Sequence, residues 1–326
     1  MSRVQLRDSF VMPETADIFV SNLTQFAQTN PDAAERLEAA HLASVEQAYG
    51  FDGGEETTRK PFIYENGFAV IPVHGALLNR FGGAYSFATG YNYIRRMMTA
   101  ALEDGDVQVI VLDVDSPGGE AAGCFELADE IRAAREQKPI LAVVDSLCAS
   151  AGYAIGSSAT KVYATPSSKI GSIGVIRMHM NLKGMLDKMG VEVTIIEAPE
   201  DGMKSAGSPY RPLTPAEKAD FQESVNKAYA DFVTLIVANR GMTADAVIET
   251  KAKVFRADEA LALTLIDAVK TPTEAVSSFM AELADECDDE DDLPQSEDEE
   301  MSKTNSEVTS AAPAAAAPAA AAAAAP

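Results

Sequence analysis

The chain has 326 residues, of which 47% are hydrophobic, enough for one substantial core with additional segments. Its net charge of −24 argues against nucleic-acid binding, because phosphate groups repel an acidic surface. The three cysteines show neither metal-ligand spacing nor a paired framework, and no run of residues has the pattern of a signal peptide or a transmembrane span. We therefore expect a chain from a reducing compartment, without disulfides, a cysteine-ligated metal, a signal peptide or a transmembrane helix.

Residues 1–60 are expected to form a helical N-terminal extension. Residues 33–46 contain many strong helix formers with a weak apolar stripe, and Asn30-Pro31-Asp32 suits the start of a helix. We expect His41 to lie on the exposed surface of this helix. A polar, glycine-containing segment at residues 50–60 then leads into the next domain.

Residues 61–272 predict an α/β domain with a mainly parallel sheet, because buried strands alternate with amphipathic helices. The expected strands cover residues 68–75, 107–114, 140–144, 161–164, 172–176 and 191–196, and the expected helices cover 91–102, 120–135, 182–189 and 214–239. Within the last helix, Thr214-Pro-Ala-Glu217 predicts a capping box with proline in the first turn.

Residues 273–326 differ in composition from the rest of the chain. Glu282 to Glu300 contain twelve acidic residues and no basic one, and repeats of alanine and proline follow. With so few large apolar residues this tail cannot build a core, so we expect it to be disordered or transiently helical. The sequence stops within low-complexity repeats, which fits either a longer natural product or a flexible tail.

Two glycine-containing breaks follow neighbouring strands, at Ser116–Gly119 and Ala149–Gly152. Parallel α/β sheets collect their chemistry at the carboxyl ends of strands, where both breaks fall. At Ser150 the strand turns directly into a helix, which would expose the hydroxyl and direct free N–H groups towards a developing oxyanion. The pattern indicates a serine nucleophile for acyl transfer, with a tight packing turn as the alternative. Cys148 is a second candidate nucleophile, although a small buried apolar role is commoner for such a residue.

A serine nucleophile needs a base, and the sequence offers two candidates. His179 follows the expected strand 172–176, and Lys204 lies in the small-residue loop Gly202–Gly207. A lysine can serve as a base when partial burial keeps its amine neutral. From residue type alone, however, Lys204 is more often a solvated surface residue.

Three motifs in order carry a family resemblance: Asp113-Val-Asp-Ser-Pro-Gly-Gly119, Cys148-Ala-Ser-Ala-Gly-Tyr153 and Lys169-Ile-Gly-Ser-Ile-Gly-Val175. Over residues 68–270 they resemble the S49 peptidases, the signal peptide peptidase A-like serine proteases of the ClpP/crotonase fold. The resemblance implies a Ser–Lys dyad and no metal or cofactor. The implied roles are nucleophile for Ser150, general base for Lys204, a hydroxyl that holds the lysine amine for Ser172, and backbone oxyanion donors for Gly119 and Ala151. Because ClpP uses a histidine after the corresponding strand, His179 remains the alternative base.

The loop around Lys204 lacks the Gly-Lys-Tyr-Lys pattern of cellular members and looks more like the phage branch, the lambda-type capsid assembly or head maturation proteases. That branch implies a soluble serine endopeptidase of the host cytoplasm and procapsid, which cleaves scaffold and its own tail, with portal protein as a further candidate substrate. The implied partners are scaffold, portal and major capsid proteins and further copies of the chain, without nucleic acid or membrane. Our hypothesis is that Met301, in the sequence Met-Ser-Lys-Thr-Asn-Ser-Glu, is an internal in-frame start of a scaffold protein, with an ordinary methionine in a disordered tail as the alternative. The alternatives are a bacterial cytosolic SppA-like peptidase and a non-catalytic capsid or connector component.

Overall fold

The computed structural model describes residues 25, 26, 28–51, 60–200 and 202–291. The chain divides into two units, Met1–Glu282 and Leu283–Pro326. The acidic and Ala/Pro-rich tail beyond residue 291, including Met301, lies outside the described residues, as do residues 1–24, 27 and 52–59 of the expected N-terminal extension.

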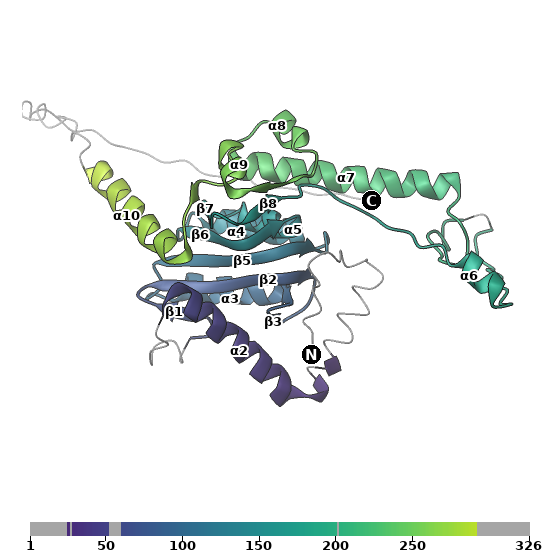
Figure 1. The fold of residues 1–326 in the computed structure, drawn as a ribbon, viewed down its shortest axis with the longest axis horizontal. Coiled ribbons are helices and arrows are strands. Elements are labelled where there is room, and N and C mark those ends of the chain that lie inside the picture. The colour runs from purple at the N-terminus through teal and green to yellow at the C-terminus, as the bar shows by residue number, and fades with distance from the viewer. Residues whose placement is uncertain (1–24, 27, 52–59, 201, 292–326) are drawn as a thin grey trace, which may run out of the picture. The chain divides into compact units, whose positions relative to one another are not determined.

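A ten-stranded, mainly parallel sheet forms the centre of the first unit (Figure 1). Its strands are β1 (Ile63–Glu65), β2 (Phe68–Leu78), β3 (Ala84–Tyr85), β4 (Ala88–Gly90), β5 (Val109–Gly119), β6 (Ile140–Ala149), β7 (Lys161–Ala164), β8 (Lys169–Gly171), β9 (Val254–Arg256) and β10 (Ala268–Val269). The main order is β10-β7-β6-β5-β2-β4-β3, with β1 on β2, β8 on β6 and β9 on β8. Only β1–β2, β3–β4 and β8–β9 pair antiparallel among these strands.

Helices connect and cover the strands, as expected for βαβ units. They are α2 (Pro31–Tyr49), α3 (Tyr91–Glu103), α4 (Cys124–Ala134), α5 (Ala151–Gly156), α6 (Lys183–Lys188), α7 (Pro215–Arg240), α8 (Ala244–Glu249), α9 (Ala257–Ala262) and α10 (Pro272–Asp291). At the start of α7, Thr214 and Glu217 form the predicted capping box. None of the described helices is long and apolar enough to cross a membrane.

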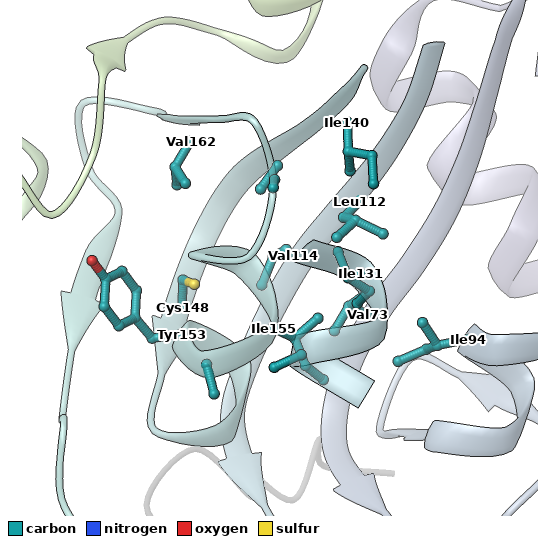
Figure 2. Packing of buried hydrophobic residues seen from close by; sticks show 14 of the residues in the cluster. Val73, Ile94, Leu112, Val114, Ile131, Ile140, Cys148, Tyr153, Ile155 and Val162 are labelled. Atoms are coloured by element: carbon teal, nitrogen blue, oxygen red, sulfur yellow. The ribbon is translucent and has the colours of Figure 1, made fainter. Parts of the chain in front are cut away.

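The hydrophobic core lies between one face of the sheet and helices α3, α4, α5 and α7 (Figure 2). Leu112 and Val114 of β5 project to this face, next to Ile131 of α4 and Ile155 of α5. Alternate residues of a strand point to opposite faces, so Asp113 projects to the other side. There its carboxylate accepts a hydrogen bond from Tyr49 of α2. Helix α2 therefore covers the face opposite to α3, α4 and α5.

The predicted alternation of strands and helices and the mainly parallel sheet are confirmed, but two predicted strands are wrong. After Gly171 the chain leaves the sheet, because Ser172 has a positive φ of 53° that interrupts an extended backbone. Residues 191–196 form no strand either. Their side chains are exposed and no strand lies beside them, so the β-branched residues of this segment do not belong to the sheet.

Two further expectations differ from the structure. His41 is only 6% exposed, because α2 turns this side of the helix towards the sheet, so the expected surface position is wrong. Helix α10 begins at Pro272, where the sequence alone predicts the tail. Its first turns are anchored by buried Ala275 and Phe279, and the Phe279 ring meets the Tyr163 ring edge-on at 6.4 Å between centroids.

Candidate active site

Ser150 occupies the sharp turn between β6 and α5. Its backbone has φ 53° and ψ −124°, a conformation that costs a non-glycine residue about 1–3 kcal/mol. The turn is fixed from both sides: the Ser150 N–H donates to the Gly171 carbonyl at 2.9 Å, and the Ser150 carbonyl accepts from Ala154 N–H at 3.0 Å. The strand–helix geometry predicted for this serine is therefore present.

The end of β5 lies directly against Ser150. A Cβ atom built on Gly118 would come within 2.7 Å of the Ser150 Cβ and within 3.1 Å of Ala151 N, and Gly118 has φ +108°. A Cβ on Gly119 would meet the Leu77 carbonyl oxygen at 2.0 Å. Both positions therefore require glycine for a steric reason.

The direction of the Gly119 N–H follows from the pairing of β5 with β2. Leu77 pairs with Gly119, and the Leu77 carbonyl accepts from Glu120 N–H at 3.0 Å. Successive N–H groups of a strand point to opposite sides, so the Gly119 N–H points away from β2. Strand β6 lies on that side of β5, and Ser150 follows β6.

The first turn of α5 adds further N–H groups next to Ser150. Ala154 is the first residue of this helix whose N–H bonds back to Ser150, so the Ala151 N–H precedes the intrahelical ladder. Gly118 brings the end of β5 against this same N–H. The turn thus presents the two backbone donors expected at positions 119 and 151 on the side of the serine.

Ser172 lies one residue beyond the carbonyl that anchors Ser150. Its own N–H donates to Lys253 O at 2.8 Å, and its side chain is half-buried. The structure therefore brings Ser150, Ser172, Gly119 and Ala151 to one edge of the sheet.

The two candidate bases lie elsewhere, on the segment between β8 and α7. We call residues 176–214 the arm; it carries His179, α6 and Lys204. Arg177 stacks on the Phe221 ring at 3.4 Å, and Gly207 packs against the same ring, so the arm is attached to the first half of α7. With a rise of 1.5 Å per residue, Phe221 is about 16 Å along the helix from Phe232, which is buried in the core.

An ion pair between Arg211 and Glu217 holds the arm to the start of α7. Arg211 donates to both carboxylate oxygens of Glu217, at 2.7 and 2.6 Å, and its guanidinium also bonds to Ser205. Hydrogen bonding from Arg211, and then from the Thr214 backbone, lowers the pKa of Glu217 to about 2. Lys204, which precedes Ser205 in the chain, is exposed and forms no hydrogen bond or ion pair within the described residues. His179 is half-buried, and its Nε2 has no hydrogen-bond partner among the residues that the structure describes.

Comparison with known protein families identifies the region that contains Ser150. Residues 132–285 match the model of Peptidase family S49. This region belongs to peptidase family S49. It contains Ser150, Ser172 and Lys204, whereas Gly119 precedes the match.

Curated relatives match a longer part of the chain than the family model does. The head-tail preconnector protein GP5 of Enterobacteria phage P21 is 35% identical over 258 residues, which are 74% of this chain and 50% of that protein. Capsid assembly protease C of Escherichia phage lambda is 33% identical over 251 residues, 76% of this chain and 56% of that protein. Protease 4 of Haemophilus influenzae is 26% identical over 273 residues, which are 78% of this chain and 44% of that protein. The chain spans about half the length of the curated relatives it matches.

Cys148 and Cys124 are not placed to act as nucleophiles. Cys148 is fully buried, its thiol contacts the Gly152 carbonyl at 3.4 Å, and burial raises its pKa well above the ordinary value. Burial likewise raises the pKa of Cys124 to about 12. A buried thiol held in this form is a poor nucleophile at neutral pH, which leaves Ser150 as the candidate. The described residues contain no group of His, Cys, Asp and Glu side chains arranged to hold a metal ion.

Two polar arrangements of the strands β2 and β5 were not predicted from the sequence. Ser116, interpreted there as part of a strand break, is completely buried with its hydroxyl hydrogen-bonded on both sides. On the α2 face, His74 Nε2 lies 2.8 Å from an Asp113 carboxylate oxygen, Tyr49 donates to the other oxygen, and the His41 ring stands 4.9 Å from the His74 ring. Only the Asp-x-Asp-Ser-Pro-Gly-Gly motif pointed to this region in the sequence.

Proposed function

We propose that the chain is a serine endopeptidase in which Ser150 is the nucleophile and Lys204 the general base. The observation that carries the proposal is the turn at Ser150, which lies in the region that matches family S49. Its backbone is strained, and the glycines at the end of β5 pack closely against it. Strained backbone conformations of non-glycine residues cluster at functional sites.

The chemistry assigns each group a role. Ser150 Oγ bonds to the scissile carbonyl carbon while its proton passes to the neutral Lys204 amine, which then protonates the leaving amine as the C–N bond breaks. Water repeats the sequence on the acyl-enzyme and releases the second product. The N–H groups of Gly119 and Ala151 hold the oxyanion, and the Ser172 hydroxyl holds the lysine amine.

This dyad requires the arm to meet Ser150. In the described chain Lys204 is exposed beside the first half of α7, and no contact joins it to Ser150. Most of the exposed large apolar side chains in the described residues also lie on the arm, namely Ile176, Met178, Met180, Met185, Met189, Val191, Val193, Ile195, Ile196, Met203 and Tyr210. We infer a homo-oligomer that covers these side chains and seats the arm at a Ser150, of its own or of a second chain.

The biological setting follows from the relatives, a capsid assembly protease and a head-tail preconnector protein. We place the peptidase in the procapsid, within the host cytoplasm, with scaffold and its own tail as substrates and with portal and major capsid proteins as partners. Portal protein is a further candidate substrate.

The test is co-expression of the longest natural form with its capsid genes, followed by mass spectrometry of the products. We expect Ser150→Ala and Lys204→Ala to abolish cleavage of tail and scaffold. Two exposed residues outside the arm serve as matched controls, and Ser167→Ala and Lys227→Ala should cleave like the wild type.

Other outcomes separate the alternatives. If Lys204→Ala still cleaves while Ser150→Ala does not, Lys204 is not the base, and His179→Gln is tested next. Restored cleavage when the two inactive variants are mixed would show that the dyad forms between chains. Unchanged products from the wild type and Ser150→Ala, in cells that assemble heads, would overturn the peptidase assignment in favour of a structural component.

A further inference from the structure

Ser116 lies where β5 departs from regular pairing with both neighbouring strands. The register between β2 and β5 shifts between His74 and Ala76, and that between β5 and β6 shifts between Val114 and Ser116. Ser116 is completely buried between these two irregularities. Side chains at bulges commonly replace the ladder hydrogen bonds that the bulge removes.

The Ser116 hydroxyl makes one bond to each side of the irregular region. It donates to the Gly75 carbonyl at 2.7 Å and accepts from the Gly118 N–H at 3.0 Å. A serine hydroxyl has a single proton, so its donor is fully used by Gly75. The hydroxyl therefore ties the end of β5 to β2 through side-chain chemistry alone.

These two bonds determine which backbone donor of the loop remains free. Pro117 has no N–H, and the Gly118 N–H is bonded to Ser116. The next N–H, that of Gly119, points away from β2 towards the side of Ser150, as shown above. Two consecutive glycines have wide conformational freedom, so without a tether the peptide between them could rotate and misdirect this donor.

We propose that Ser116 is a positioning residue for the oxyanion-binding loop, which holds the Gly118 N–H so that the Gly119 N–H faces the Ser150 nucleophile. The proposal rests on the proposed peptidase function and deepens it. Ser116 does not touch the substrate; it acts through the orientation of the Gly118–Gly119 peptide. Removal of its hydroxyl should therefore weaken transition-state stabilisation more than substrate binding.

The first experiment compares Ser116→Ala with Ser158→Ala in the full chain. Ser158 is an equally buried serine whose hydroxyl donates to Ala154 O and accepts from Asn239, away from the loop. On a peptide that spans a cleavage site mapped in the natural tail, we expect kcat of Ser116→Ala to fall roughly ten- to a hundredfold with KM changed less than about twofold. Labelling of Ser150 by a small fluorophosphonate should slow by a similar factor. Ser158→Ala should keep its wild-type kcat, and a Ser116→Ala kcat within twofold of wild type would overturn the proposal.

The second experiment uses the wild-type protein and therefore does not depend on the variant folding. Residue-resolved hydrogen exchange should show the Gly118 amide protected in the free protein and the Gly119 amide protected only after the fluorophosphonate adduct forms. Rapid exchange of Gly118 in the free protein would contradict the tether. If instead Ser150→Ala retains cleavage, the peptidase assignment fails, while the exchange result still reports whether Ser116 holds the loop.

Discussion

At the scale of single residues, the active-site edge is built by exclusion of side chains as much as by their presence. Gly118 leaves only enough room for a hydrogen next to the Ser150 Cβ, and its φ of +108° suits no other residue. Ser150 and the Gly118–Gly119 loop are therefore in van der Waals contact, so a change in one displaces the other.

We expect Gly118→Ala to abolish peptidase activity, by a factor of at least about 100, because the new methyl group forces the loop away from Ser150. Peptide cleavage and fluorophosphonate labelling measure the loss. Gly105→Ala is the matched control, since a Cβ there meets nothing within 4 Å. A Gly118→Ala protein that folds and cleaves at the wild-type rate would contradict the described contact.

The sequence was sufficient to predict the strand–helix turn at Ser150 and the two glycine-containing breaks, because an apolar strand that ends in small residues and glycine predicts a sharp turn. It was not sufficient for Ser116, whose bonds depend on register shifts in two strand pairs that no local pattern reports. Lys204 remains a prediction, since its neighbours on the exposed arm say nothing about where the arm docks.

At the scale of elements, helix α2 is attached to the sheet by a buried polar cluster rather than by apolar packing alone. His41 and Tyr49 of the helix face His74 of β2 and Asp113 of β5, and the carboxylates of Asp115 and Asp145 add negative charge nearby. Burial, and then Asp113, raises the pKa of Tyr49, which keeps its hydroxyl a donor. The weak apolar stripe of this helix concealed the buried face from sequence analysis.

The two histidines of this cluster respond to pH in opposite directions. Burial, and then the charge of His74, lowers the pKa of His41 from about 6.5 to about 4, so its contribution to stability is complete above pH 6.5 and disappears as pH falls towards 4. For His74 burial opposes a charge, but Asp113 outweighs it and raises the pKa. Its contribution is present below pH 6.5 and disappears as pH rises through the folded-state pKa.

We predict that His41→Leu removes the acid side of this dependence. Between pH 6.5 and pH 4 the wild type should lose several degrees of Tm relative to the variant, because only the wild type must protonate a buried imidazole. Thermal unfolding across this range measures the difference. Parallel curves for His41→Leu and wild type would refute the buried-histidine explanation.

The element pattern also shows where sequence reasoning stops. Strands with continuous apolar runs, such as β5 and β6, were predictable because burial on both faces leaves that signature. Segment 191–196 largely alternates apolar and polar residues, which predicts a half-buried strand, yet its apolar side chains are exposed on the arm. Composition reports that a surface must be covered, but not whether a sheet or another molecule covers it.

At the scale of the whole molecule, the exposed apolar arm contrasts with the strongly acidic chain that carries it. Ile196 is 93% exposed, the highest value among the exposed large apolar side chains of the described residues. Exposure of many such side chains on one segment is unusual for a protein that acts alone and marks a surface for association.

We predict that Ile196→Glu shifts the oligomer towards smaller species and reduces cleavage in parallel, because a carboxylate cannot be buried at an apolar contact without cost. Sedimentation velocity measures the size distribution. Ile248→Glu on α8, also exposed but away from the arm, should leave both unchanged. An unaltered distribution for Ile196→Glu would exclude this part of the arm from the contact between chains.

The strained backbone of Ser150 also has an evolutionary consequence. Because its left-handed conformation costs energy that glycine would not pay, a Ser150→Gly substitution should make the fold more stable while it removes the nucleophile. In a lineage that used this fold only for a structural role, selection for stability would therefore favour glycine at position 150. A serine in that conformation is the residue that selection for stability alone would discard.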